Sequence, residues 1–195
     1  MRVRRSRLAT PLLACLAAAA TAILLAGCGS GGASASNSVV SKQQYTQGLA
    51  DSPAPLADLH NRMGQVGGGT SEFDAQVRAL RGYPIVVNAW AHWCIPCKAE
   101  LPLFQRASLR YGRRVAFVGL NADDTTSAAK SFIAGYPLPY PSFEDPSMSI
   151  FRKLGGGAGL PTTFFLNRDG KVVLPKQGQF ASQADLDAAI RRYAL

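Results

Sequence analysis

The feature that most constrains the fold is a buried strand that runs directly into a pair of cysteines. Residues 85–91 form a short, nearly all-apolar run that begins with three β-branched side chains. Such a run is typical of a strand that is buried on both faces of a sheet. Cys94 and Cys97 follow at once, and the residues after Pro96 favour a helix. The sequence therefore predicts that both cysteines lie at a strand-to-helix corner.

This corner suits a reactive thiol. The start of a helix leaves backbone N–H groups unpaired and carries the positive end of the helix dipole, and both favour a thiolate. Cys94 is therefore the expected nucleophile. Pro96 fits the first helical turn without losing a hydrogen bond, and Cys97 lies within reach to close a disulfide. We expect the Cys94 thiolate to attack a partner's disulfide and Cys97 to resolve the mixed disulfide.

A structural disulfide and half of a zinc site are the other interpretations of this pair. A structural zinc ion needs about four ligands. Outside the N-terminal leader, the only cysteines and histidines are Cys28, Cys94, Cys97, His60 and His92. We therefore expect no metal. His92 is interpreted as a polar residue near the rim of the corner, without an assigned role.

Two separated motifs in this chain resemble a known family. The first covers residues 87–91 and 93–102, and the second covers residues 160–166. Both resemble the TlpA/ResA-like membrane-anchored thiol–disulfide oxidoreductases, in the same order and spacing. The resemblance covers residues 82–195. It implies an α/β fold, a thioredoxin-like three-layer sandwich with a central mixed sheet and helices on both faces.

The resemblance also implies roles for residues outside the cysteine pair. In thioredoxin folds the proline at the position of Pro161 is cis and faces the cysteines, and the preceding residue, here Leu160, presents backbone groups to the substrate. Relatives place an acidic residue at the position of Glu100, where it is thought to manage the proton of the buried cysteine. Without the resemblance, Glu100 reads as a solvated residue on a helix surface. Thioredoxin instead buries an aspartate where this chain has Asn88, which does not titrate.

The N-terminal segment resembles the export signal of a lipoprotein. Residues 1–27 combine a basic start, an apolar run of about 15 residues and small residues before Cys28. In such signals the cysteine receives the lipid and becomes the mature N-terminus, so we expect lipidation at Cys28. An uncleaved anchor is the alternative, but the run is shorter than the roughly 20 residues that span a bilayer. Arg4 and Arg5 leave the choice between general and twin-arginine export open.

Between the signal and the domain, the sequence predicts two further segments. Residues 28–52 are interpreted as a flexible tether, because their first part is rich in Gly, Ser, Ala and Asn and poor in apolar groups. Apolar residues at helical spacing then predict an N-terminal helical extension over residues 53–81. This extension departs from the family, which commonly opens with strands.

Periodicity and turn residues predict the other elements of the domain. We expect helices at 95–111, 125–135 and 146–154, strands at 114–120, 142–143, 162–166 and 171–174, and a last helix capped by Ser182. Pro102 should kink the first of these helices. The glycine-rich run at 155–159 lacks the spacing of a phosphate loop and is interpreted as a plain loop.

Charge and composition exclude some classes of function. The chain carries a net charge of +9, and without residues 1–27 it keeps 17 basic and 12 acidic side chains, a net charge of +5. These basic residues are scattered along the sequence, so we expect no nucleic-acid partner. The length of 195 residues suits one domain with a leader and a linker. A monomer is expected.

These observations predict a lipid-tethered thiol–disulfide oxidoreductase outside the cytoplasm. The electrons would reside in the Cys94–Cys97 pair, so no cofactor is needed, and Trp93 and Pro96 would tune the exposure and geometry of the pair. The resemblance implies a reductant of disulfides in exported proteins, serving cytochrome c or metal-site maturation. It also implies a membrane electron donor of the DsbD/CcdA type.

Three alternatives remain open. An oxidant that introduces disulfides into exported proteins would use the same residues, because the sequence does not determine a reduction potential. A peroxiredoxin-type enzyme shares the general fold, but the close cysteine pair argues against it. A copper chaperone would space its cysteines more widely and add a histidine downstream, and no histidine follows His92.

Overall fold

We analysed a computed structural model of the protein, which describes residues 40–195. The predicted signal sequence of residues 1–27 and the predicted lipidation site Cys28 lie outside the described residues. Within residues 40–195, no helix is both long and apolar enough to cross a membrane.

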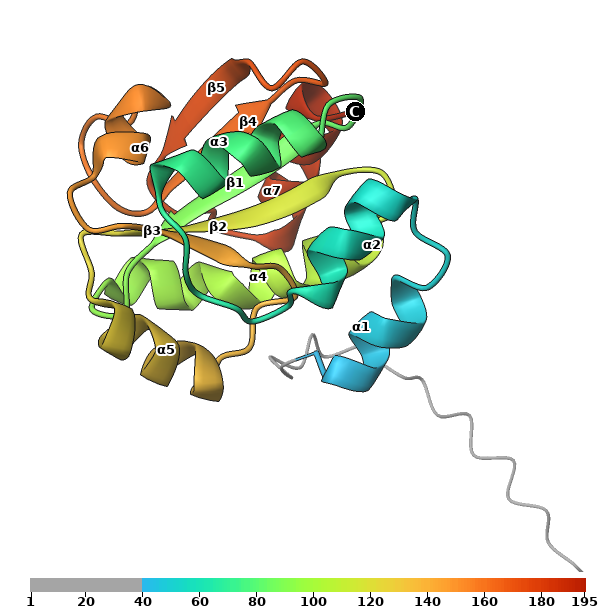
Figure 1. The fold of residues 1–195 in the computed structure, drawn as a ribbon, viewed down its shortest axis with the longest axis horizontal. Coiled ribbons are helices and arrows are strands. Elements are labelled where there is room, and N and C mark those ends of the chain that lie inside the picture. Colours follow the sequence, from blue (N-terminus) through green and yellow to red (C-terminus); the bar gives the residue numbers. More distant parts are fainter. Residues whose placement is uncertain (1–39) are drawn as a thin grey trace, which may run out of the picture. The chain divides into compact units, whose positions relative to one another are not determined.

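A five-stranded mixed sheet forms the centre of the domain (Figure 1). Its strand order is β3-β2-β1-β4-β5. The central strand β1 pairs in parallel with β2 and antiparallel with β4. The strands are β1 (Ile85–Trp90), β2 (Ala116–Ala122), β3 (Ser142–Asp145), β4 (Thr162–Leu166) and β5 (Val172–Gln177).

Helices cover both faces of the sheet and bury a separate apolar core against each. One core joins the sheet to α4 (Ile95–Tyr111), α5 (Thr126–Gly135) and α7 (Gln183–Tyr193). The other joins it to α2 (Ala54–Asn61), α3 (Thr70–Ala79) and α6 (Ser149–Lys153). In Figure 1, α4 and α5 lie on the opposite side of the sheet from α3. The three predicted layers are therefore confirmed.

The alternation of side chains along β1 explains why this strand is apolar at every position except Asn88. Val86 and Trp90 belong to the core under α4, whereas Ile85, Val87 and Ala89 belong to the core under α3. All six residues of the strand are buried. In a strand with one solvated face, apolar and polar residues would alternate, so the nearly continuous apolar run of β1 follows from burial on both faces.

The secondary structure predicted for residues 82–195 is confirmed, with ends that differ by no more than three residues. The helical extension predicted over residues 53–81 contains α2 and α3. The tether predicted over residues 28–52 is wrong in its last part, because Lys42–Gly48 forms the helix α1. Tyr45 and Leu49 bury this segment against Leu109 of α4.

Gly119 is the point of closest packing between the central strands. A Cβ atom added there would lie 2.0 Å from the Ser142 Oγ atom and 3.1 Å from the Trp90 Nε1 atom. The same two atoms form a buried hydrogen bond of 3.2 Å that joins β1 to β3. Only glycine leaves room for this bond.

We therefore expect Gly119→Ala to lower the free energy of unfolding by about 1–3 kcal/mol, because the added methyl group overpacks a rigid core. Urea denaturation of the two proteins measures the difference. Gly135→Ala is the matched control, since nothing lies within 4 Å of an added Cβ at this exposed helix end. Equal losses in the two variants would contradict the packing argument.

Candidate active site

The two cysteines lie at the start of α4, just after the end of the central strand β1. Cys94 is the N-cap of the helix, and its Sγ atom accepts a hydrogen bond of 3.2 Å from the Cys97 backbone N–H. The two residues form a disulfide with a Cα–Cα distance of 5.3 Å. Pro96 lies in the first turn, as the sequence predicted. The end of the helix thus offers a donor and a positive dipole to the sulfur of Cys94.

Exposed apolar side chains flank the buried sulfur atoms. Cys94 is 3% and Cys97 1% exposed, whereas Trp93 is 50% and Ile95 78% exposed. Trp93 and Ile95 directly precede and follow Cys94 in the sequence, so both side chains adjoin the cysteine pair. A partner that contacts this rim would cover the sulfur atoms as it docks.

The loop that joins β2 to α5 fixes the residues immediately before the cysteine pair. The Trp93 Nε1 atom donates to the Asp123 carbonyl oxygen at 2.8 Å. The His92 backbone N–H donates to Asp124 at 2.7 Å, and the His92 Nδ1 atom lies 2.5 Å from the other carboxylate oxygen of Asp124. Asn121 also donates to Asp124, at 2.8 Å. His92 is thus paired with a carboxylate, which its position in the sequence did not indicate.

Asp124 is held as a carboxylate by this network. Burial acts to raise the pKa of Asp124, but hydrogen bonds from His92, Asn121 and Thr125 outweigh burial and hold the pKa below its ordinary value. A charged acceptor at this point can fix several backbone and side-chain donors at once. The network therefore keeps the rim of the site in one conformation.

Glu100 is buried one helical turn beyond Cys97 and is not a solvated surface residue. It is 1% exposed, accepts a hydrogen bond of 3.0 Å from the Asn88 side chain and accepts another of 3.1 Å from the Phe180 backbone N–H. Burial raises the pKa of Glu100 to about 7, although these two bonds and the charge of Lys176 act to lower it. A carboxyl group with this pKa can exchange a proton near neutral pH.

Pro161 lies beside the end of the central strand. The Leu160–Pro161 peptide bond is cis, as the resemblance implied. The next residue, Thr162, pairs with Ala89 in β1, five positions before Cys94. Leu160 packs against the core cluster that contains both cysteines. The fold thus places the motif at residues 160–166 beside the motif that contains the two cysteines.

The predicted site residues within the described part of the chain therefore lie in one region. Several functional candidates escaped the sequence analysis: Asp124, Asn121, Phe180 and Lys176. Apart from the contact between Asn121 and Asp124, three positions apart, their partners lie 31 or more positions away or are backbone atoms, so no local pattern marks these residues. Within residues 40–195, no three His, Cys, Asp or Glu side chains are arranged to hold a metal ion.

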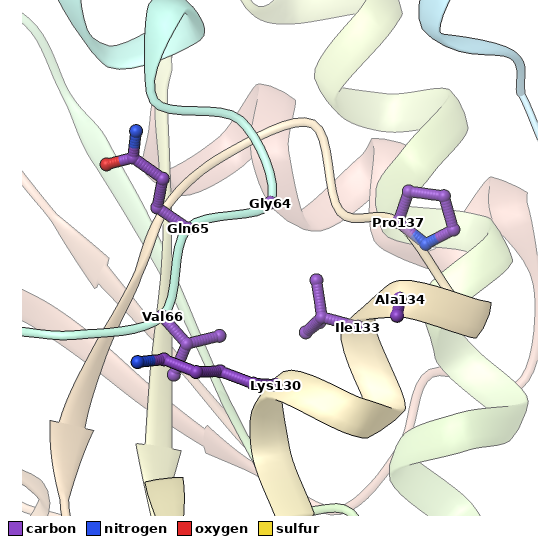
Figure 2. A pocket seen from close by; sticks show the side chains of 7 residues that line it. All are labelled: Gly64, Gln65, Val66, Lys130, Ile133, Ala134 and Pro137. Carbon is purple, nitrogen blue, oxygen red and sulfur yellow. The ribbon is translucent and has the colours of Figure 1, made fainter. Parts of the chain in front are cut away.

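The hollow drawn in Figure 2 is not part of this site. It has a volume of about 650 Å³ and lies between α5 and the segment that follows α2. Ile133 and Val66 point into it, Lys130 lies at its edge, and none of the predicted site residues lines it.

Comparison with known proteins places this arrangement in a family. The model of the AhpC/TSA family matches residues 53–174, more than half of the chain. The chain belongs to the AhpC/TSA family. The matched segment begins at the helical extension and includes both cysteines, Glu100 and Pro161.

Individual relatives carry names that refer to disulfide chemistry. Thiol-disulfide oxidoreductase ResA of Bacillus thuringiensis (strain Al Hakam) is 35% identical over 99 residues, which are 50% of this chain and 57% of ResA. Thiol:disulfide interchange protein DsbE of Pseudomonas fluorescens biotype C is 34% identical over 94 residues, 48% of this chain and 51% of DsbE. The chain thus spans about half the length of the curated relatives it matches.

A solved structure agrees with the fold. A putative thiol:disulfide interchange protein DsbE from Chlorobium tepidum superposes with a TM-score of 0.56 at 28% identity, over 60% of this chain and 84% of that one. This AhpC/TSA family member therefore has the thioredoxin-like fold that the motifs implied.

The raised pKa of Glu100 predicts a pH dependence of stability. The folded-state pKa of about 7 lies above the ordinary value of 4.5, so the folded protein holds a proton that the unfolded chain releases between these values. Glu100 therefore favours the folded state fully below pH 4.5, and this contribution is lost as the pH rises to 7. We expect the free energy of unfolding to fall by about 3 kcal/mol across this window.

Glu100→Gln should remove this fall while keeping the buried volume. Urea denaturation of the oxidised protein at pH 4.5 and pH 8 measures the change in each variant. Asp58→Asn, on the exposed side of α2, is the control and should behave as the unmodified chain. A Glu100→Gln protein with the original pH dependence would contradict the assignment.

Proposed function

We propose that this protein is a thiol–disulfide oxidoreductase that acts on disulfides of exported proteins outside the cytoplasm. The observation that carries the proposal is the joint placement of three groups: a Cys94 sulfur atom at a helix N-terminus, a Cys97 sulfur atom one turn on, and a buried Glu100 whose pKa is about 7. Each group supplies one requirement of disulfide exchange. The names of the ResA and DsbE relatives support the same chemistry.

The reaction follows from this geometry. In the reduced protein, the Cys94 thiolate attacks one sulfur atom of the partner's disulfide, and the other partner sulfur leaves as a thiolate that takes up a proton. The Cys97 thiol then gives up its proton and attacks the Cys94 sulfur of the mixed disulfide. This step releases the second partner thiol and closes the Cys94–Cys97 disulfide, so two electrons pass to the partner.

Glu100 would manage the proton of Cys97. The two residues lie one turn apart on α4, and both are buried. Water therefore has little access to the Cys97 thiol and would be a poor acceptor for its proton. With a pKa of about 7, the carboxylate accepts a proton as readily as it releases one at neutral pH. Pro161 and Leu160 would form the wall of the substrate groove beside the cysteines.

We further propose that the protein is a reductant held at the membrane. Support comes from the likeness of residues 1–28 to a lipoprotein signal, which would place a lipid on Cys28. Each turnover oxidises the cysteine pair, so a reductant needs a thiol donor, and a membrane protein of the DsbD/CcdA type fits this need. Cytochrome c or metal-site maturation would supply substrates whose cysteines must be reduced.

The reduction potential distinguishes a reductant from the alternative, an oxidant of exported proteins. Equilibration of the protein with dithiothreitol or glutathione buffers measures it. We expect a value near −270 mV, as for thioredoxin. A value near −120 mV would instead identify an oxidant.

Substitution of each cysteine tests the order of events. Cys97→Ser should accumulate a mixed disulfide between Cys94 and a disulfide-bonded substrate, because the resolving thiol is missing. Cys94→Ser should form no such adduct. Mass spectrometry of the trapped species reads out both results. Peroxide consumption that survives in Cys97→Ser would instead favour a peroxiredoxin-type reaction.

Glu100→Gln tests the proton step. The variant cannot take up a proton, so the rate of disulfide exchange at pH 7 should fall by about a hundredfold and lose its midpoint near pH 7. Stopped-flow measurement of exchange with a small disulfide over pH 5–9 gives both quantities. An unchanged pH profile would remove Glu100 from the mechanism.

A further inference from the structure

A three-residue turn connects the two predicted parts of the active site. Residues 178–180 follow β5 and precede α7. The Gly178 backbone N–H donates to the Pro161 carbonyl oxygen at 2.9 Å, and the Phe180 backbone N–H donates to the Glu100 Oε2 atom at 3.1 Å. A displacement of this turn would therefore weaken its hydrogen bonds to both Pro161 and the buried Glu100 carboxyl group.

The side chain of Lys176 contacts every residue of this turn. The Lys176 Nζ atom donates to the carbonyl oxygens of Gly178 at 2.5 Å and Gln179 at 2.7 Å. The same atom lies 4.2 Å from the centroid of the Phe180 ring. Charge-assisted hydrogen bonds and cation–π contacts are both stronger than their neutral counterparts. A lysine near the end of a strand would ordinarily extend into water, whereas this half-buried one contacts all three residues of the turn.

The backbone of the turn depends on the same arrangement. Gly178 has a φ of +76°, which side-chain-bearing residues rarely adopt. In this conformation its N–H reaches Pro161 while its carbonyl oxygen reaches Lys176. The glycine permits the turn, and the lysine satisfies the two carbonyl oxygens that the turn leaves outside the sheet.

We propose that Lys176 is a positioning residue for disulfide exchange, which places the Phe180 N–H and a positive charge next to Glu100 and holds the turn against Pro161. The inference rests on the proposed role of Glu100 as the proton carrier for Cys97. Lys176 acts through Glu100 and the turn and touches no reacting atom.

The charged and titratable groups around Glu100 give Lys176 a definite electrostatic effect. Tyr140 faces Glu100 from the segment before β3, and burial raises its pKa, so it stays neutral. Cys97 lies on the same helix as Glu100, and Asn88 on β1 carries no charge. Lys176 therefore supplies the positive charge, which acts to lower the pKa of Glu100.

The same pairing acts on Lys176. Burial lowers the pKa of Lys176 below its ordinary value, and the charges of Glu100 and of Asp185 on α7 oppose this shift. Without the lysine charge, the buried carboxylate would be less stable and Glu100 would hold its proton to higher pH. The lysine thus keeps the midpoint of Glu100 close to neutral pH.

Lys176→Met tests the inference, because it keeps an apolar stem against Phe180 and removes the charge and both hydrogen bonds. We expect the midpoint of the exchange rate, measured over pH 5–9, to move up by about one pH unit, which is a tenfold change in proton affinity. Lys176→Arg keeps the charge and should stay close to the original midpoint. An unchanged midpoint in Lys176→Met would overturn the inference.

The same shift must disappear in the Glu100→Gln background. There, Lys176→Met should leave the pH profile of Glu100→Gln unaltered; a shift that persists would mean that Lys176 acts on another group and would overturn the inference. If Glu100→Gln alone keeps the original profile, the proposed role of Glu100 fails. If Glu100→Gln changes the profile but Lys176→Met does not, only the role of Lys176 fails.

Hydrogen exchange separates positioning from general destabilisation. In Lys176→Met the Phe180 amide should exchange at least tenfold faster, because the turn that aims it at Glu100 is released. Amides in the core of β1 should exchange at the original rate. Equal acceleration throughout the domain would mark a structural role only and would overturn the inference.

Discussion

The burial of the Glu100 carboxyl group, one helical turn beyond Cys97, is the constraint on which the rest of the site depends. Desolvation makes a buried carboxylate unstable, so its partners must be placed accurately. β1 supplies the Asn88 amide, and the turn before α7 supplies the Phe180 N–H. Both come from elements whose positions are set by the two cores. The packing of the sheet and its helices is therefore what gives Glu100 a pKa that suits proton exchange.

Much of this arrangement could be predicted from the sequence because its signals are local. The apolar run of β1 indicates burial on two faces. The cysteine spacing together with Pro96 indicates a helix start, and α4 does span the predicted residues 95–111. The residues just before α4, in contrast, carry no local pattern that predicts their contacts. His92 gave no sign of its carboxylate partner, because Asp124 lies 32 positions away.

The one error of prediction missed a local signal. Ser41 and Gln44 form a capping box that starts the helix α1, and Tyr45 and Leu49 stabilise this helix by packing against Leu109 of α4. Glu100 looks solvated when only its own helix is considered. Its burial follows from the approach of the Phe180 turn, 80 positions downstream. Lys176 has no motif at all, since its partners are backbone oxygens.

The exposed rim and the buried interior of the site would have different tasks in the proposed exchange reaction. The sulfur atoms and Glu100 are buried, so under the proposed function the same groups would act on every disulfide that reaches Cys94. Trp93 and Ile95 are exposed, and Trp93 is anchored by its bond to the β2–α5 loop. An apolar surface held in one conformation binds at a lower cost in entropy than a mobile one. Under the proposed function, discrimination between partner proteins would therefore depend on this rim, and the rate of exchange would depend on the buried groups behind it.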